Sequence, residues 1–254
     1  MRFLVTNDDG ILAHGLDVLV RAAEPLGEVS IVAPDREQSA TSHSLTVHHP
    51  LRATKRGDRR WQVDGTPTDC VMLAVEALLP QRPDFVLSGV NHGQNLGEDT
   101  LYSGTVAAAM EGLTLGIPSI AFSFAGGAQR AEAAHLDEQL PVITRIIKHV
   151  TSLPAFPPDT LLNVNLPPVS GASLKGARLT RLGRRVFSES LQAAKDPWGK
   201  PVYWIGGGSA NWQGSAADSD FQAVRDGFVS ITPLHLDLTH FGALDSADAW
   251  WKPL

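Results

Sequence analysis

Short apolar runs and amphipathic stretches alternate along the first part of the chain. Residues 2–6 form an apolar run that ends at a polar turn, which is typical of a buried parallel strand. Residues 15–26 carry leucine, valine and alanine at helical spacing, and residues 28–33 are again apolar and β-branched. A strand, a helix and a second strand in this order are typical of the opening of a doubly wound α/β fold.

The same alternation continues as far as residue 165. Apolar spacing predicts further helices over residues 66–79, 103–115 and 136–150. Apolar runs predict further strands over residues 84–88, 119–123 and 161–165. Strands that alternate with helices favour a mostly parallel, doubly wound sheet with helices on both faces.

The chain changes character after Pro167 and Pro168. Alternating residues predict strands over 175–182 and 228–232, whereas residues 184–226 are rich in glycine, serine and tryptophan and show no helical period. Within that segment, an arm that buries apolar surface against a partner chain would explain three tryptophans: Trp198, Trp204 and Trp212. Earlier in the chain, residues 51–64 surround a charged turn and predict a hairpin.

The length of 254 residues allows one large domain with a sizeable core. We expect a single domain over residues 1–254, with the α/β core over about residues 1–170 and a β-rich arm segment over about residues 171–254. Basic residues number 21 and acidic residues 27, so the net charge of −6 argues against a nucleic-acid polymer as partner.

A single cysteine, Cys70, excludes an internal disulfide framework and a cysteine-rich zinc module. No apolar run approaches the roughly 20 residues of a membrane span, and residues 1–9 do not resemble a signal peptide. We therefore expect a cytoplasmic protein without a membrane partner.

Polar residues follow the first predicted strand, in the order Asn7, Asp8, Asp9, Gly10. These residue types are common in plain turns, which is the simplest interpretation. Ligands of open parallel sheets, however, bind beyond the carboxyl ends of the strands. Two adjacent carboxylates repel each other there unless a cation neutralises them, and a hard divalent ion with oxygen ligands fits this requirement.

Two further polar loops are expected at the same edge of the sheet. Ser39 follows the second predicted strand and is a candidate oxygen ligand, although a surface serine is the simpler interpretation. Asn91 and Asn95 lie in a glycine-rich loop after the third strand, where backbone N–H groups can form an anion nest. Residues 103–105 then open a helix, and their hydroxyls either cap it or help to seat a phosphate.

A metal ion, carboxylates and an anion nest at one edge describe metal-assisted hydrolysis of a phosphate ester. The metal would polarise a phosphoryl oxygen and prepare a water for attack, and the nest would stabilise charge on the phosphoryl group. The histidines favour no zinc site, since no HExxH motif is present. For His43 and His92 a structural or solvated role is the simpler interpretation.

Six segments resemble the SurE family, the survival protein E nucleotidases, and they follow the family order over nearly the whole chain. They are FLVTNDDG (3–10), VAPDREQSATSHSLTVHHPL (32–51), VDGTPTDCV (63–71), SGVNHGQNLGEDTLYSGTVAAAMEG (88–112), RLTRLGRRVF (178–187) and AVRDGFVSITPLHLDLT (223–239). The resemblance implies a Rossmann-like core and a C-terminal β-hairpin arm that exchanges between the subunits of a homodimer or homotetramer. It also implies a metal-dependent phosphatase of nucleoside 5′- and 3′-monophosphates and, in some members, of short polyphosphate.

The resemblance also implies roles for single residues. The ligands of one divalent ion per subunit, Mg²⁺ or Mn²⁺, would be Asp8, Asp9, Ser39 and Asn91. The phosphate would face Asn95, Ser103, Gly104 and Thr105. Asp8 and Asp9 are the catalytic candidates, and Asp8 would orient or deprotonate the attacking water. Two alternatives remain open: a phosphatase that forms an aspartyl-phosphate on Asp8, and a nucleotide-binding module without turnover.

Overall fold

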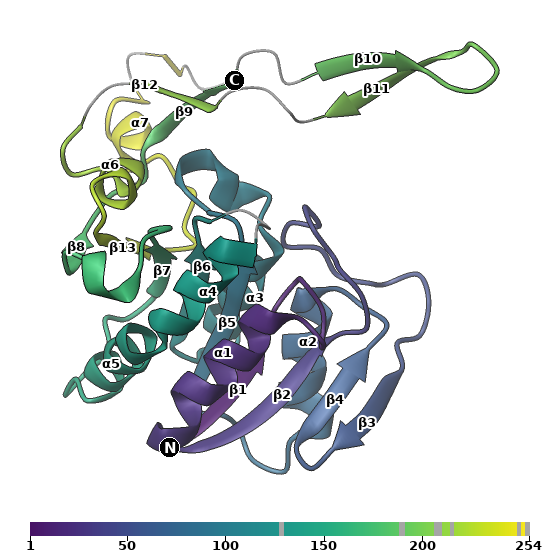
Figure 1. The fold of residues 1–254 in the computed structure, drawn as a ribbon, viewed down its shortest axis with the longest axis vertical. Coiled ribbons are helices and arrows are strands. Elements are labelled where there is room, and N and C mark those ends of the chain that lie inside the picture. The colour runs from purple at the N-terminus through teal and green to yellow at the C-terminus, as the bar shows by residue number, and fades with distance from the viewer. Residues whose placement is uncertain (127–129, 188–190, 206–209, 214–215, 248–249, 252–254) are drawn as a thin grey trace.

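The centre of the computed structural model is a nine-stranded sheet (Figure 1). The structure describes residues 1–126, 130–187, 191–205, 210–213, 216–247 and 250–251. The strand order is β3-β4-β2-β1-β5-β6-β7-β13-β8, and the bounds are β1 Arg2–Thr6, β2 Glu28–Pro34, β3 Ala53–Gly57, β4 Arg60–Val63, β5 Phe85–His92, β6 Ser119–Phe124, β7 Leu161–Leu166, β8 Ala177–Leu179 and β13 Val229–Leu234. All pairs from β4 to β7 are parallel, whereas β3 pairs antiparallel with β4 and β13 with β7. This mostly parallel sheet confirms the predicted α/β class.

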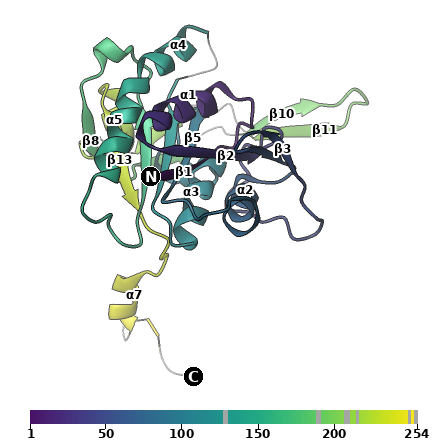
Figure 2. The same ribbon diagram turned by 90° about the horizontal axis from the view of Figure 1, so that it is seen from below.

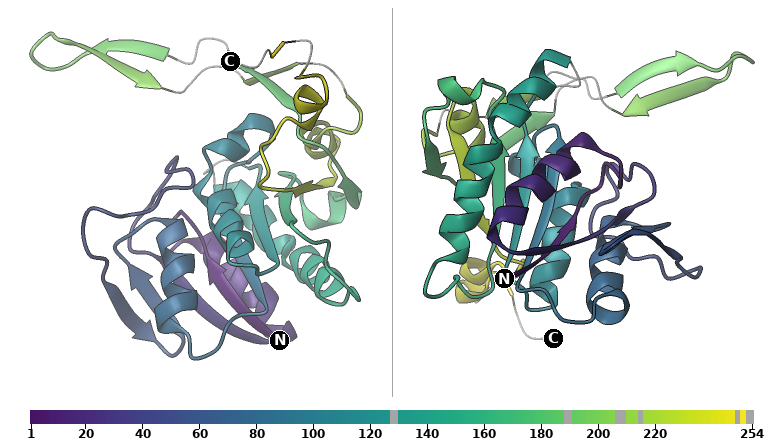
Figure 3. Two further views of the ribbon diagram at one scale, coloured as in Figure 1. Left: turned by 180° about the vertical axis from the view of Figure 1, so that it is seen from behind. Right: turned by 60° about the horizontal axis from the view of Figure 1, so that its bottom comes forward.

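Helices cover both faces of the sheet, as Figures 2 and 3 show. Their bounds are α1 His14–Ala23, α2 Pro67–Leu73, α3 Gly104–Thr114, α4 Arg130–Glu138, α5 Leu140–Thr151, α6 Asp220–Arg225 and α7 Phe241–Asp245. Strand alternation separates the two largest clusters of the described core, since neighbouring residues of a strand point to opposite faces. Val5 packs in the cluster that contains Leu19 of α1 and Ile147 of α5, and Leu4 packs in the cluster that contains Cys70 of α2 and Ala108 of α3.

The helix predicted over residues 136–150 is two helices in the structure. α4 ends at Glu138 and α5 begins at Leu140, and the buried Gln139 stands between them. Its Nε2 donates to the backbone oxygens of Pro167 and Val169, at 2.8 and 2.7 Å. The apolar spacing continues across the break, so the sequence pattern alone does not reveal it.

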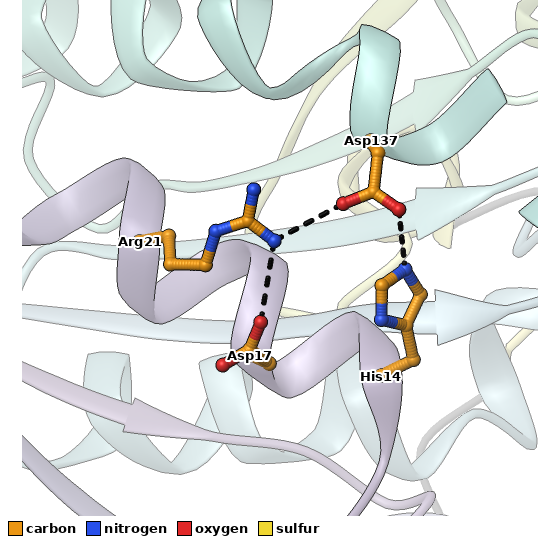
Figure 4. Close-up of polar contacts among 4 residues, drawn as sticks. All are labelled: His14, Asp17, Arg21 and Asp137. Atoms are coloured by element: carbon orange, nitrogen blue, oxygen red, sulfur yellow. Dashed lines mark hydrogen bonds and ion pairs between the residues drawn. The ribbon is translucent and has the colours of Figure 1, made fainter. Parts of the chain in front are cut away.

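Four exposed side chains connect α4 to α1, as Figure 4 shows. Arg21 donates to Asp137 at 3.1 Å and to Asp17 at 3.3 Å, and His14 lies 2.9 Å from the other oxygen of Asp137. Such exposed pairs contribute little to stability, but they orient the two helices relative to each other.

Strand β5 extends beyond the predicted residues 84–88. The chain continues through Gly89, which has a positive φ of +124°, and a Cβ at this position would lie 2.2 Å from the backbone oxygen of Phe122. The register against β6 shifts between Ser88 and Asn91. A local irregularity of this kind changes the direction of the side chains that follow it, and here it places Asn91 at the end of the sheet.

The C-terminal part contains two short helices that were not predicted, α6 within the segment 184–226 and α7 after it. The sequence reading missed them because six and five residues are too few to show a helical period. The other elements of this segment are strands, with bounds β9 Arg184–Phe187, β10 Leu191–Lys195, β11 Pro201–Ile205 and β12 Ala210–Gln213.

Strands β10 and β11 form an antiparallel hairpin that projects away from the sheet (Figures 1 and 3). The predicted hairpin arm is therefore present. Every described residue of its two strands is exposed, including Trp204 and Ile205, while the side chain of Trp212 lies outside the part of the chain that the structure describes. No helix of the described chain is long and apolar enough to cross a membrane.

Candidate active site

The loops that follow β1, β2 and β5 meet the start of α3 at one edge of the sheet. A cavity of about 230 Å³ lies there, and the predicted residues that line it are Asp8, Ser39, Asn91, Asn95 and Ser103. Asp9, Gly104 and Thr105 do not line the cavity, but each contacts a residue or loop that does, as described below. The structure therefore brings all of the predicted site residues to one place.

Asp8 is the most buried carboxylate of this cavity, with 5% of its surface exposed. The Thr105 hydroxyl donates a hydrogen bond to Asp8 Oδ1. Gly104 allows this approach, because a Cβ there would lie 2.8 Å from the Asp8 Cβ. Burial raises the pKa of Asp8 from its ordinary value to about 6, while the Thr105 hydrogen bond lowers it and the neighbouring charge of Asp9 raises it.

Asp9 connects the first loop to the loop after β5. Its Oδ2 accepts a hydrogen bond from the His92 backbone nitrogen at 3.1 Å. Burial also raises the pKa of Asp9, and the His92 hydrogen bond opposes this shift. The turn itself is closed by Asn7, whose Nδ2 donates to the backbone oxygen of Gly10 at 2.9 Å. The turn interpretation of residues 7–10 and the ligand interpretation are therefore compatible.

Ser39 and Asn91 each have their hydrogen-bond donor engaged within the protein. The Ser39 hydroxyl donates to Glu37 Oε1 at 2.6 Å, and Asn91 Nδ2 donates to the backbone oxygen of Gly93 at 2.9 Å. Each side chain thus keeps an oxygen that can accept, which is the atom type that a hard cation binds.

Asn95 and Ser103, which also line the cavity, are held by hydrogen bonds within the protein. Asn95 Nδ2 donates to Ser123 Oγ at 2.8 Å, and the Asn95 backbone oxygen accepts hydrogen bonds from Asn163 and Asn165. Ser103 is the N-cap of α3, because its Oγ accepts from the Val106 backbone nitrogen at 3.0 Å. A capped helix still presents free N–H groups in its first turn, so the capping role and a phosphate seat coexist here.

The loop that carries Ser39 is fastened along α3. The Gln38 backbone nitrogen donates to the Asp8 backbone oxygen at 2.7 Å, and the Ser42 nitrogen donates to the Tyr102 oxygen at 3.2 Å. His43 Nε2 lies 2.8 Å from Glu111 Oε2, and the Glu111 side chain is only 5% exposed. This contact with Glu111 fits the structural role that is the simpler interpretation of His43.

Four polar or aromatic residues of the cavity lining were not proposed as site residues from the sequence: His92, Gln94, Asp99 and Tyr102. All four lie in the segment between Asn91 and Ser103, which was already identified as a ligand loop. A loop without a regular period gives no indication of which side chains turn inward. In the sequence, only their position between two proposed site residues, Asn91 and Ser103, could have identified them.

The oxygen atoms of this cavity suit Mg²⁺ or Mn²⁺ better than zinc. Within the described ranges, no group of three or more His, Cys, Asp or Glu side chains could hold a metal ion. A cation would instead meet two carboxylates and two neutral oxygens, from Asp8, Asp9, Ser39 and Asn91. Mg²⁺ is commonly held by one or two carboxylates and keeps several water ligands, and Mn²⁺ accepts the same oxygen donors. Two adjacent carboxylates, the buried Asp8 and the partly buried Asp9, fit such an ion.

Comparison with known proteins finds the same family by sequence and by structure. The family model described as "Survival protein SurE" matches residues 3–189. The chain is 69% identical over 252 residues to a 5′-nucleotidase SurE of Gemmatimonas aurantiaca, and the match covers 99% of both chains. A 5′-nucleotidase SurE of Aeromonas hydrophila is 47% identical, with 98% of both chains covered. The crystal structure of the SurE protein from Aquifex aeolicus superposes with a TM-score of 0.86 at 44% identity, covering 98% of this chain and 99% of that one.

The hydrogen bond between Thr105 and Asp8 generates a prediction about stability. The variant Thr105→Val keeps the side-chain shape and removes the donor from a buried carboxylate. We expect it to lower the free energy of unfolding by about 1.5–3 kcal/mol, the range for hydrogen bonds to charged groups. Thr114→Val is the matched control, because Thr114 lies on the same helix and is exposed. Equal denaturant midpoints for the two variants would contradict the assigned role of the bond.

Proposed function

The chain belongs to the SurE family, and from this premise we propose that it is a divalent-metal-dependent 5′-nucleotidase. It hydrolyses nucleoside monophosphates to a nucleoside and phosphate. The observation that carries the proposal is that one cavity is lined by Asp8, Ser39 and Asn91 together with Asn95 and Ser103. Oxygen ligands for a cation and a helix N-terminus for a phosphate thus share one space.

Asp8, Asp9, Ser39 and Asn91 would hold one Mg²⁺ or Mn²⁺ ion per subunit. When bound, such an ion supplies Lewis-acid polarisation of a phosphoryl oxygen and makes water a better nucleophile. Two hydrogen bonds support this assignment, because they fix the positions of two of these residues: the Gln38 backbone nitrogen donates to the Asp8 backbone oxygen, and the His92 backbone nitrogen donates to the Asp9 carboxylate.

The phosphate of the substrate would lie against Asn95, Ser103, Gly104 and Thr105. The first-turn N–H groups of α3 donate to its oxygens, and the partial positive charge of the helix N-terminus favours the dianion. Asp8 orients the attacking water. Thr105 holds Asp8 Oδ1, which leaves Oδ2 to accept a hydrogen bond from that water.

Two alternatives make different predictions at the same site. If Asp8 is a covalent nucleophile, acid quenching during turnover traps a phosphoryl-enzyme, whereas direct attack by water leaves none. If the protein is a binding module, nucleotides bind with metal but no phosphate is released. We favour direct attack because the Thr105 hydroxyl already donates to Asp8 Oδ1, so one of the two carboxylate oxygens is engaged as an acceptor.

Phosphate release from a panel of substrates tests the proposal. The panel contains nucleoside 5′- and 3′-monophosphates and a short polyphosphate, each with metal-stripped, Mg²⁺-loaded and Mn²⁺-loaded protein. We expect turnover of the 5′-monophosphates that depends on the metal, and a fall of about 100-fold or more in Asn91→Ala, because one ligand of a site with few protein ligands is lost. A control variant is Gln62→Ala, which alters an exposed strand pair away from the cavity.

The outcome that would overturn the nucleotidase proposal is specific. Folded, metal-loaded protein that releases no phosphate from any of these substrates would favour the binding module. Turnover that persists unchanged in Asn91→Ala would mean that the activity does not belong to this cavity.

We also propose that the segment of residues 171–254 joins the subunits of a homodimer or homotetramer. The hairpin of β10 and β11 supports this, because it exposes large apolar side chains far from the sheet: Leu191 is 63% exposed, Trp204 69% and Ile205 89%. Apolar surface of this kind is typical of an interface with another chain.

Sedimentation velocity tests the arm. We expect the wild-type chain to sediment as a dimer or tetramer, and the double variant Trp204→Ser, Ile205→Ser to sediment as a smaller species. The control is Leu12→Ser, which removes another highly exposed apolar side chain outside the hairpin. A wild-type monomer, or a double variant with unchanged mass, would contradict the proposal.

A further inference from the structure

The loop of residues 38–46 brings Ser39 to the candidate active site, although the loop has no apolar packing of its own. None of its residues, all of which the structure describes, is buried. Ala40 and Ser42 have positive φ values of +57° and +54°, a backbone region that residues with a side chain seldom adopt. Such residues keep their conformation only where surrounding contacts hold them, so hydrogen bonds must fix this loop.

Two backbone hydrogen bonds fasten the loop on either side of Ser39. Before it, the Gln38 nitrogen donates to the Asp8 oxygen at 2.7 Å, and after it the Ser42 nitrogen donates to the Tyr102 oxygen at 3.2 Å. Residues 39–41 lie between these two bonds. Because this span is short, the position of the Ser39 hydroxyl depends on both, and the longer bond at Ser42 is the weaker of the two.

The far end of the loop is fastened to the start of α2. The Thr66 hydroxyl donates to the Ser44 backbone oxygen at 2.8 Å, and Asp69 Oδ1 accepts from the Thr46 backbone nitrogen at 2.9 Å. The same two residues of α2 form a capping box, which closes the first turn of this helix. The loop therefore spans from α3 to α2, and His43 lies between its two ends.

His43 connects the middle of the loop to a buried carboxylate of α3. Its Nε2 lies 2.8 Å from Glu111 Oε2. A carboxylate only accepts hydrogen bonds, so the imidazole Nε2 carries the hydrogen that is donated. Within the described ranges, His43 is the only group that hydrogen-bonds this carboxylate. A carboxylate that is almost buried is costly without a partner, so this contact fastens the loop more strongly than an exposed pair would.

Helix α3 holds two parts of the candidate cation site at once. Thr105, in its first turn, donates to Asp8, and Glu111 lies six residues further along the same helix. Six residues are less than two helical turns. One rigid element thus fixes Asp8 through Thr105 and the loop of Ser39 through Glu111, which sets the distance between two predicted ligands.

We propose that His43 and Glu111 are positioning residues of the candidate cation site. Their contact holds the loop against α3, so that Ser39 reaches the cation that Asp8 binds. This inference rests on the proposed function and adds to it two residues that do not touch the ion. Without the imidazole, water must enter to hydrate the Glu111 carboxylate, and this loosens the loop beside Ser42. Ser39 then leaves its place for part of the time, and the affinity for the ion falls.

Calorimetry with Mn²⁺ and metal-stripped protein, without substrate, tests this role. His43→Ala removes the contact, and we expect the Mn²⁺ affinity to fall about tenfold, the lower end of the range for residues that support metal ligands. His43→Gln places an amide nitrogen near the position of Nε2, and we expect it to restore most of the affinity. The matched control is His48→Ala, which removes another exposed histidine just beyond the loop and keeps the wild-type affinity.

A double-mutant cycle separates positioning from a general loss of structure. Ser39→Ala removes the ligand that the contact is proposed to place. If His43 acts through Ser39, His43→Ala has no further effect on the Mn²⁺ affinity once Ser39 is alanine. A general loosening of the fold would also disturb Asp8 and Asn91, so the affinity would fall again in the double variant.

Two results would overturn the inference: wild-type Mn²⁺ affinity in His43→Ala, or equal losses from His43→Ala with Ser39 present and absent. Where circular dichroism shows that His43→Ala does not fold, His43→Asn takes its place in both measurements, because its shorter polar side chain ends nearer the backbone. Failure of the proposed function is distinguishable. The wild-type protein would then bind no Mn²⁺ or release no phosphate, whereas failure of the inference leaves both intact and removes only the difference between the variants.

Discussion

The hydrogen bond from Thr105 to Asp8 joins the end of β1 to the start of α3, and the other loops of the site are arranged around this contact. It places a carboxylate in an environment that penalises its charge, as the raised pKa of Asp8 records. Gly104 permits the close approach. The backbone oxygen of Asp8 holds Gln38, and so the loop of Ser39, while Asp9 holds His92, and so the loop of Asn91. Asp8 and Asp9 together thereby connect the start of α3, the loop of Ser39 and the loop of Asn91 around the candidate cation site.

The parallel sheet explains why these segments meet. Strands β2, β1 and β5 are neighbours, and their carboxyl ends lie at one edge, where α3 also begins. The next strands in the order, β6 and β7, end at the same edge, where Phe221 and Val224 of α6 pack with Leu96 and Ala125 from the segments after β5 and β6. Asp220 fixes α6 there by accepting hydrogen bonds from the backbone nitrogens of Gly97 and Gly183.

Much of the core was predictable from the sequence, because buried strands such as Arg2–Thr6 and Leu161–Leu166 are bounded by turn residues. The break at Gln139 was not, since it depends on hydrogen bonds to the backbone of the loop after β7. Helix α6 was missed because it is short and follows an irregular segment. At the site, the residues alone left Ser103 open between a cap and a phosphate seat, and the family motif supplied the ligand set. Gln94 and Tyr102 were missed because their inward direction depends on the folded loop.

The central claim is that Asp8, Asp9, Ser39 and Asn91 form one cation site beside the N-terminus of α3. Anomalous scattering at the manganese edge, from crystals grown with Mn²⁺, tests it most directly. The account predicts one strong peak per subunit, within coordination distance of oxygen atoms of these four residues. A well-ordered site without a peak, or a peak whose ligands lie elsewhere on the chain, would contradict it.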